Sequence, residues 1–292
     1  MDYKQKTEEF RAEFENVLNE YLERTVIKPD ILNESFRYSL ENGGKRIRPV
    51  LMFASARMLG GKVTDVTALA LALEMIHTYS LIHDDLPSMD NDDFRRGIPT
   101  SHKKFGEGQA ILAGDALLNE AYSVCFETSK KGRSYLRAAA LICDNAGVNG
   151  MVAGQAADLY YEGKQADRLA YEYIVFNKTA KMIMSALAVP ACVYDLDDNI
   201  YSLLLELGKN VGFLFQVTDD ILDVSGSLST LGKTAGKDLA EKKLSCVNLF
   251  GMQESVRLAD EYYSRSISIL DELPYEAEYL RALIGAIRER DR

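Results

Sequence analysis

Helical periodicity along almost the whole chain is the feature that most constrains the fold. Apolar residues from Phe10 to Leu22 recur at the spacing of one helix face, and residues 64–85 are apolar on most sides, as in a buried helix. Only 6 of the 292 residues are proline, so few positions interrupt a helix. The sequence therefore predicts an all-α fold made of long helices, in a single domain over residues 1–292.

Other helices are expected near 30–42, 107–130, 133–162, 168–189, 197–224, 238–250 and 252–292, with breaks at Gly60-Gly61, Gly132, Gly163, Pro190 and Gly226. No alternation of apolar and polar residues is long enough to predict a sheet.

Charge and cysteine content narrow the class of protein. The chain has 34 basic and 44 acidic residues, a net charge of −10, which argues against a nucleic-acid partner. The four cysteines show no metal-binding spacing, which indicates buried thiols in a reducing compartment. A charged N-terminus and the lack of a long uncharged stretch predict a cytoplasmic protein without a membrane anchor.

The first acidic cluster follows the most apolar helix, with five aspartates between Asp84 and Asp93. Such a cluster can be a solvated loop, but its repulsion at the end of a core helix favours bound cations. A calcium-binding EF-hand loop that starts at Asp90 does not fit, because Arg95 and Ser101 stand where glycine and glutamate are required.

Pro87 makes this cluster suitable for a metal. On a continuous helix Asp84 and Asp90 would lie about 120° apart around the axis and could not share an ion. Because a proline disfavours helical geometry at the residue before it, Leu86, the helix is expected to open there. Asp90 could then turn back toward Asp84.

The second acidic cluster lies inside an apolar helix. Asp219 and Asp223 are one turn apart on the same face, and Gln216 precedes them on that face. Unpaired buried charge is costly, so an incidental polar stripe is the less favoured interpretation. Carboxylates in this number suit Mg²⁺, which bridges acids to substrate phosphates.

Basic residues accompany both clusters and could invert the local charge. They are Lys45, Arg46, Arg48, Arg95, Arg96, Lys178, Lys233, Lys237 and Lys243. Taken singly, each is more readily interpreted as a solvated surface charge. Acids that hold metals beside fork-shaped arginines nevertheless indicate a site for a highly phosphorylated small molecule.

Taken together, these motifs resemble the trans-isoprenyl diphosphate synthase family, most closely its bacterial farnesyl diphosphate-forming members. The resemblance spans at least residues 40–245 and includes Gly43 to Pro49, Asp84 to Asp90 with Arg95-Arg96-Gly97, Gly114-Asp115, Gly150 to Gln155, Asp158-Leu159, Lys178-Thr179, Phe215 to Asp223 and Leu231 to Lys233. It implies the isoprenoid synthase fold, a helical bundle around a central cavity. Ala180 and the segment Ser245-Cys246-Val247 depart from the family pattern.

The resemblance also implies a role for each site residue. Metal ligands would be Asp84, Asp85 and Asp90 for two Mg²⁺ ions, and Asp219, supported by Asp220 and Asp223, for a third. The allylic diphosphate would contact Arg95, Lys178, Lys233 and Lys243, and isopentenyl diphosphate would contact Lys45, Arg48, His77 and Arg96. Lys178, Thr179 and Gln216 would face the reacting carbons. His77 could equally be a core histidine, and Thr179 and Gln216 polar positions of ordinary helices.

The implied activity is Mg²⁺-dependent condensation of isopentenyl diphosphate with dimethylallyl and geranyl diphosphate to give farnesyl diphosphate, by a homodimer. Tyr79, five residues before Asp84, is expected to block the growing chain. Alternatives are a geranyl or geranylgeranyl diphosphate synthase, a terpene cyclase or head-to-head synthase, a catalytically silent synthase subunit, and a metal-storage or structural helical protein.

Overall fold

The structure is a computed structural model that describes residues 3–229 and 244–290. Its contacts divide the chain into two compact units, Asp2–Ala140 and Leu141–Arg292, called here the N-terminal and C-terminal units. The boundary falls within helix α7 (Arg133–Ala146). The expectation of a single domain over residues 1–292 stays a prediction.

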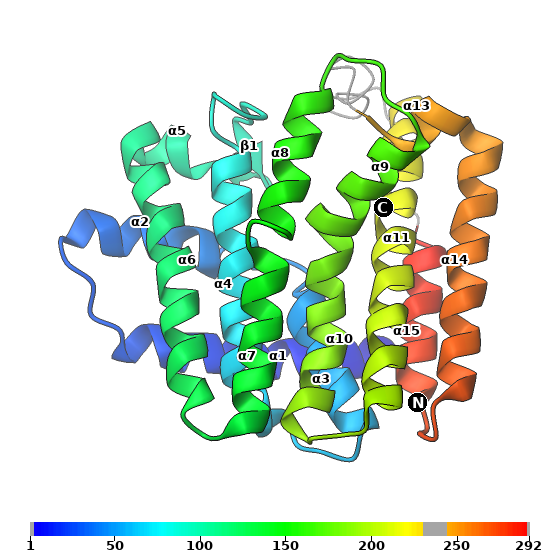
Figure 1. The fold of residues 1–292 in the computed structure, drawn as a ribbon. Helices are drawn as coiled ribbons and strands as arrows, with labels where there is room; N and C mark the ends of the chain where they lie inside the picture. Colours follow the sequence, from blue (N-terminus) through cyan, green and yellow to red (C-terminus); the bar gives the residue numbers. More distant parts are fainter. Residues whose placement is uncertain (1–2, 230–243, 291–292) are drawn as a thin grey trace. The chain divides into compact units, whose positions relative to one another are not determined.

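The N-terminal unit is helical apart from one short hairpin. Its elements are α1 (Tyr3–Arg24), α2 (Asp30–Glu41), α3 (Ile47–Met58), the 3₁₀ turn η1 (Val63–Asp65), α4 (Thr67–Asp84), β1 (Phe94–Arg95), β2 (Ile98–Pro99), α5 (Ser101–Phe105) and α6 (Glu107–Ser129). Helix α4 packs against α6, α3 and α1, and Figure 1 shows α1 lying across α4 and α6.

Apolar patterning explains how these helices pack. Helix α1 buries one stripe, Phe10, Phe14, Leu18 and Leu22, and the rings of Phe10 and Phe14 lie 6.3 and 6.4 Å from that of Phe53 in α3. Helix α4 is buried along most of its length, as its apolar sequence predicts. It is therefore the central helix of the unit, and it carries the first aspartate motif at its C-terminal end.

The C-terminal unit is built around one long helix. Its elements are α8 (Met151–Tyr161), α9 (Arg168–Ile174), the π-helical turn η2 (Val175–Ala180), α10 (Lys181–Val193), α11 (Asp198–Ser229), α13 (Cys246–Phe250), α14 (Met252–Glu272) and α15 (Glu278–Arg288). Helix α11 contacts η2, α10, α13, α14 and α15. Figure 1 shows α10, α11 and α14 side by side.

Most of the predicted helices are confirmed, and the all-α class holds for the residues that the structure describes. The predictions of single helices over 133–162 and 252–292 are wrong, because the chain leaves the helix between α7 and α8 and again between α14 and α15. The predicted helix over 238–250 lies partly outside the described residues. Pro190 and Gly226 do not end helices either: the first lies within α10 and the second within α11. In the described part of the chain, no helix is both long and apolar enough to cross a bilayer.

Candidate active site

A strained glycine turn precedes α3 and carries the first basic residues. Gly43, Gly44 and Arg46 all have positive φ angles, of 64°, 124° and 49°. A side chain at Gly44 would collide with the guanidinium of Arg96, whose carbon lies 2.6 Å from the position of the added Cβ. Arg96 also donates a hydrogen bond to the Gly43 carbonyl. The φ of Gly44 favours glycine whatever the space, and the arginine end then packs against it.

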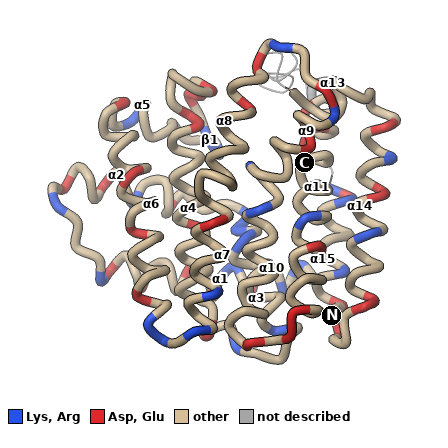
Figure 2. The backbone as a smooth tube through the Cα atoms, in the orientation of Figure 1, with Lys and Arg blue, Asp and Glu red and all other residues tan. Residues whose placement is uncertain are grey.

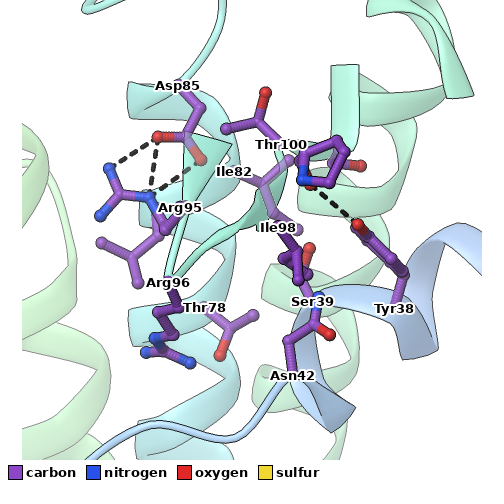
Figure 3. Close-up of a pocket in the computed structure, with 13 residues that line it drawn as sticks. Tyr38, Ser39, Asn42, Thr78, Ile82, Asp85, Arg95, Arg96, Ile98 and Thr100 are labelled. Carbon is purple, nitrogen blue, oxygen red and sulfur yellow. Dashed lines mark hydrogen bonds and ion pairs between the residues drawn. The ribbon is translucent and has the colours of Figure 1, made fainter. Parts of the chain in front are cut away.

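The hairpin of β1 and β2 separates two neighbouring arginines. Arg96 and Gly97 form its two-residue turn with φ angles of 55° and 80°, the pattern of a type I′ turn. Figure 3 shows the two guanidinium groups diverging: Arg95 meets Asp85, whereas Arg96 points away from it. The hairpin therefore sends one arginine to the aspartate motif and the other to the glycine turn.

His77 lies among the arginines of the N-terminal unit. Burial lowers the pKa of its imidazole well below the ordinary value, and the charges of Arg48, Arg96 and Arg95 lower it further. A neutral imidazole can donate one hydrogen bond without adding charge to the arginines. Together with the exposed Lys45, these side chains make the surroundings of the glycine turn positively charged, which suits an anion.

The first aspartate motif turns back on itself as predicted. Helix α4 ends at Asp84, and the amide of Asp90 donates to the Asp84 carbonyl over 2.8 Å. The Asn91 amide donates to the carbonyl of Leu86, 3.1 Å away, which is also not the spacing of an α-helix. In Figure 2, acidic positions mark the loop beside β1. The break at Pro87 therefore brings Asp90 back to Asp84.

The carboxylate of Asp85 forms an ion pair with an arginine. Its buried carboxylate accepts from Arg95 Nε at 2.8 and 2.9 Å and lies 2.6 Å from a second guanidinium nitrogen. Burial raises the pKa of Asp85, and the bond to Arg95 opposes that shift. Asp84 and Asp90 are half-buried. Asp85 thus holds Arg95 in place, while its neighbours keep access to solvent.

Tyr79 lies one turn before the motif, in the core of the unit. Its ring packs edge-on against His83, with centroids 5.8 Å apart, and it is 6% exposed. His83 is held in turn by the Ile111 carbonyl of α6 at 3.1 Å, and the added Cβ of Gly114 would lie only 2.1 Å from the imidazole. This explains the glycine at position 114. Tyr79 as a block on chain length stays a prediction.

In the C-terminal unit, Lys178 and Thr179 lie in the π-helical turn η2. Such turns are rare and are often found at functional sites. Lys178 Nζ donates to Asp158 of α8 at 2.7 Å, and both side chains are half-buried. At Gly154, an added Cβ would lie 2.2 Å from the Lys178 amide nitrogen. Helix α8 therefore contacts the widened turn closely and orients its lysine.

A hydrogen-bonded chain runs from Thr179 to Asp220. Thr179 donates to Gln216 Oε1 at 3.0 Å, and Gln216 Nε2 donates to Asp220 at 2.9 Å. Asp220 also accepts from the Tyr171 hydroxyl at 2.9 Å and from the Cys246 amide at 2.7 Å. Burial raises the pKa of Asp220 to about 6, against these three hydrogen bonds. The amide of Gln216 thus has a fixed orientation.

Asp219 and Asp223 present a different environment from Asp220. The C-terminal Arg290 donates to Asp219 and lies over the ring of Phe215, 4.8 Å from its centroid. One carboxylate oxygen of Asp223 is buried without a hydrogen-bond partner among the described residues. A buried oxygen of this kind suits a cation.

Magnesium fits this set of ligands. The described residues contain no group of three or more acidic, histidine or cysteine side chains able to enclose an ion. Mg²⁺ seldom needs such a cage, because it takes one or two carboxylates and completes its shell with water and phosphate oxygens.

Some site residues lie outside the described part of the chain, and others were missed from the sequence. Lys233 and Lys243, both predicted to contact the allylic diphosphate, belong to the first group. The residues missed from the sequence are Asp158, Tyr171 and Arg290. Asp158 stood in a recognised motif without a role, whereas no sequence pattern links Tyr171 or Arg290 to a site.

Comparison with known proteins agrees with these features. The chain is 42% identical over 281 residues to a farnesyl diphosphate synthase of Micrococcus luteus, covering 96% of this chain and 97% of that protein. It is 43% identical over 283 residues to a chloroplastic geranylgeranyl pyrophosphate synthase of Catharanthus roseus, covering 94% and 79%.

A geranyltransferase structure from Legionella pneumophila superposes with a TM-score of 0.88 at 30% identity, covering 99% of this chain and 97% of that one. The family model for polyprenyl synthetases matches residues 29–278. The chain therefore belongs to the polyprenyl synthetase family.

Proposed function

We propose that this protein is a Mg²⁺-dependent trans-prenyltransferase that condenses isopentenyl diphosphate with dimethylallyl and then geranyl diphosphate to give (2E,6E)-farnesyl diphosphate. Full-length similarity to farnesyl diphosphate synthases supports the product. The observation that carries the proposal is the divergence of Arg95 and Arg96, which creates two different anion environments within one unit.

The two environments suit the two substrates. At the glycine turn Lys45, Arg48 and Arg96 would bind isopentenyl diphosphate directly, with neutral His77 as a hydrogen-bond donor. At the aspartate motif, Asp84 and Asp90 would hold Mg²⁺ for the allylic diphosphate, with Asp85 and Arg95 beside them. Asp219 and Asp223 would hold a third ion. Bound Mg²⁺ neutralises the diphosphate and so makes it a better leaving group.

The chain's own residues assist each step of the reaction. Lys178, oriented by Asp158, binds the departing pyrophosphate, and Lys233 and Lys243 join it. The C–O bond breaks with its electron pair going to the pyrophosphate, which leaves an allylic cation. The double bond of isopentenyl diphosphate attacks that cation, which forms a C–C bond and leaves a new cation. Loss of a proton from this second cation to the pyrophosphate forms the double bond of the product.

Polar atoms in the C-terminal unit face the cationic carbons in this proposal. They are the Thr179 hydroxyl, the Gln216 amide oxygen and the Lys178 carbonyl. Thr179 and Gln216 are bonded to each other, so their oxygens are fixed before the substrate binds. No side chain acts as a nucleophile. We also propose that the enzyme works as a homodimer in the cytoplasm.

A geranylgeranyl diphosphate synthase is the second candidate, because a relative with that name is as similar as the farnesyl enzymes. The bulk of Tyr79 below the first motif favours the shorter product.

Pyrophosphate release tests the enzymatic proposal. Asp84→Asn is expected to lower turnover with isopentenyl and geranyl diphosphates by at least about 100-fold, since a metal ligand is lost. Asp93→Asn is the matched control, because Asp93 is an exposed aspartate of the same loop, paired with Lys103. Equal turnover in both variants would contradict the proposed role of the motif.

A further inference from the structure

Arg46 is the buried member of the basic cluster at the glycine turn. Its side chain is enclosed, although Lys45 before it is exposed and Arg48 after it is half-buried. Sequence alone groups it with the other cations as a possible phosphate contact. The structure turns it away from solvent, toward two glutamates.

The guanidinium of Arg46 is held from three sides. It donates to Glu15 of α1 at 2.8 and 3.3 Å, to Glu74 of α4 at 3.0 Å, and to the carbonyl of Leu40 near the end of α2 at 2.5 Å. It also lies over the ring of Phe14, 5.5 Å from the centroid. Burial acts to lower the pKa of Arg46, but Glu15 and Glu74 outweigh it, so the side chain stays charged. One residue thus joins three helices.

This buried arginine also fixes the backbone of the turn. Arg46 has a left-handed backbone conformation, which is unfavourable for a residue with a Cβ. Its carbonyl accepts the first hydrogen bond of α3, from Val50 at 3.0 Å. Arg48 lies in that first turn, and Lys45 is the adjacent residue. Any shift of Arg46 therefore moves Lys45 and Arg48 as well.

We propose that Arg46, held by Glu15 and Glu74, is a positioning residue that keeps Lys45 and Arg48 in the geometry that binds isopentenyl diphosphate. This inference rests on the proposed function. Glu74 lies one turn before His77 on α4, so the same contact also ties the glycine turn to the helix that carries the histidine. Arg46 itself makes no contact with the substrate.

The glutamates allow positioning to be separated from charge. Glu15→Gln and Glu74→Gln each remove a negative charge from a site for an anion. If charge alone mattered, both variants would bind isopentenyl diphosphate more tightly. If the clamp positions the cations, KM for isopentenyl diphosphate should rise about 10- to 100-fold, since small misplacements have effects of this size. KM for geranyl diphosphate should stay within about twofold.

Three further variants complete the experiment. Arg46→Lys keeps the charge but loses the planar fork, so it should also raise KM for isopentenyl diphosphate. Glu20→Gln is the matched control on α1, because its partner Arg24 is exposed and 3.6 Å away. Its KM values should equal those of the wild type. Glu15→Ser removes the more exposed of the two glutamates, since Glu15 is 30% exposed, and it leaves Glu74 in place.

The outcomes separate this inference from the proposed function. A wild-type protein without turnover would refute the function itself. With an active wild type, an unchanged or lower KM for isopentenyl diphosphate in the glutamate variants would overturn the clamp. An equal rise in both KM values together with a lower Tm would show a purely structural role and would overturn it as well.

Discussion

Asp220 shows how one buried side chain organises the residues around Gln216. Its carboxylate accepts from Gln216, Tyr171 and the backbone of Cys246. Three donors stabilise the anion, whereas burial favours the neutral acid. Burial is the larger effect, and it raises the pKa of Asp220 to about 6. The charge at this position therefore opposes folding near neutral pH.

Asp220→Asn tests this balance through stability. Folded Asp220 has a pKa of about 6, above the value near 3.9 of an unfolded aspartate. Its contribution to the free energy of unfolding is thus complete below about pH 4 and is lost as the pH rises through 6. Relative to the Asn variant, the free energy of unfolding of the wild type should fall by up to about 3 kcal/mol between pH 4 and 7.5.

Urea unfolding at several pH values measures that difference. Asp271→Asn is the control, because Asp271 is an exposed aspartate paired with Arg281 in the same unit. If the wild type became more stable relative to Asp220→Asn as the pH rose, the raised pKa of Asp220 would be contradicted.

Tyr79 is predicted to limit product length. Tyr79→Ala should give products longer than fifteen carbons, because the ring below the first motif is removed. The cavity should also cost about 3–5 kcal/mol of stability. Tyr79→Phe keeps the ring and should keep the fifteen-carbon product. The measurement is chromatography of the dephosphorylated products, and an unchanged profile in the alanine variant would refute a role for Tyr79 in chain length.

Individual residues could be predicted from sequence only where local spacing sets their position. Pro87 and the return of Asp90 to Asp84 follow from helix geometry, and the structure confirms them. The partners of Asp85 and Arg46 could not be predicted, because buried ion pairs depend on which helices pack together. The sequence predicted that Gln216 lies on the same helix face as Asp219 and Asp223, yet its amide donates to Asp220.

Among the elements, the π-helical turn depends on close approach by its neighbours. An added Cβ at Gly212 of α11 would lie 2.4 Å from the Cα of Ala180 and 2.6 Å from its Cβ. Ala180 is also the position at which the chain departs from the family pattern of glycine. The glycine on the facing helix makes room for the alanine, so the departure leaves Lys178 and Thr179 in the turn.

Gly212→Ala should disturb this contact. We expect the free energy of unfolding to fall by about 1–3 kcal/mol, because an extra methyl group in a packed contact forces the two backbones apart. Turnover should fall as well, since α11 carries Gln216 and the turn carries Thr179. Gly285→Ala is the matched helical control, because its added Cβ would meet only the Tyr263 hydroxyl, at 3.8 Å. Thermal unfolding and kcat of the two variants provide the comparison, and equal values would contradict the packing argument.

Helices were predictable from periodicity, whereas the hairpin was not. The strands β1 and β2 have two residues each, too few for an alternating pattern. Their turn depends on positive φ angles at Arg96 and Gly97, and only the glycine hints at this. Pro190 was expected to end a helix, but it lies in the buried α10, where packing holds the helix across the missing hydrogen bond.

For the whole molecule, the net charge of −10 conceals a local inversion of charge. Arg48, Arg95 and Arg96 gather around His77, while two separate clusters of aspartates form the two motifs. Composition argues against a nucleic-acid partner but gives no sign of this local cluster of arginines, because a sum of charges carries no positions. The order of motifs along the chain predicted the family, and the comparisons confirm it.

The product made from the simplest substrates tests the central claim most directly. The purified protein should be incubated with isopentenyl and dimethylallyl diphosphates and Mg²⁺, with a parallel sample in EDTA, and the dephosphorylated products separated by chromatography. We predict a fifteen-carbon alcohol that forms only with Mg²⁺. A twenty-carbon or ten-carbon alcohol as the main product would contradict the farnesyl assignment, and no prenyl alcohol at all would contradict the enzyme.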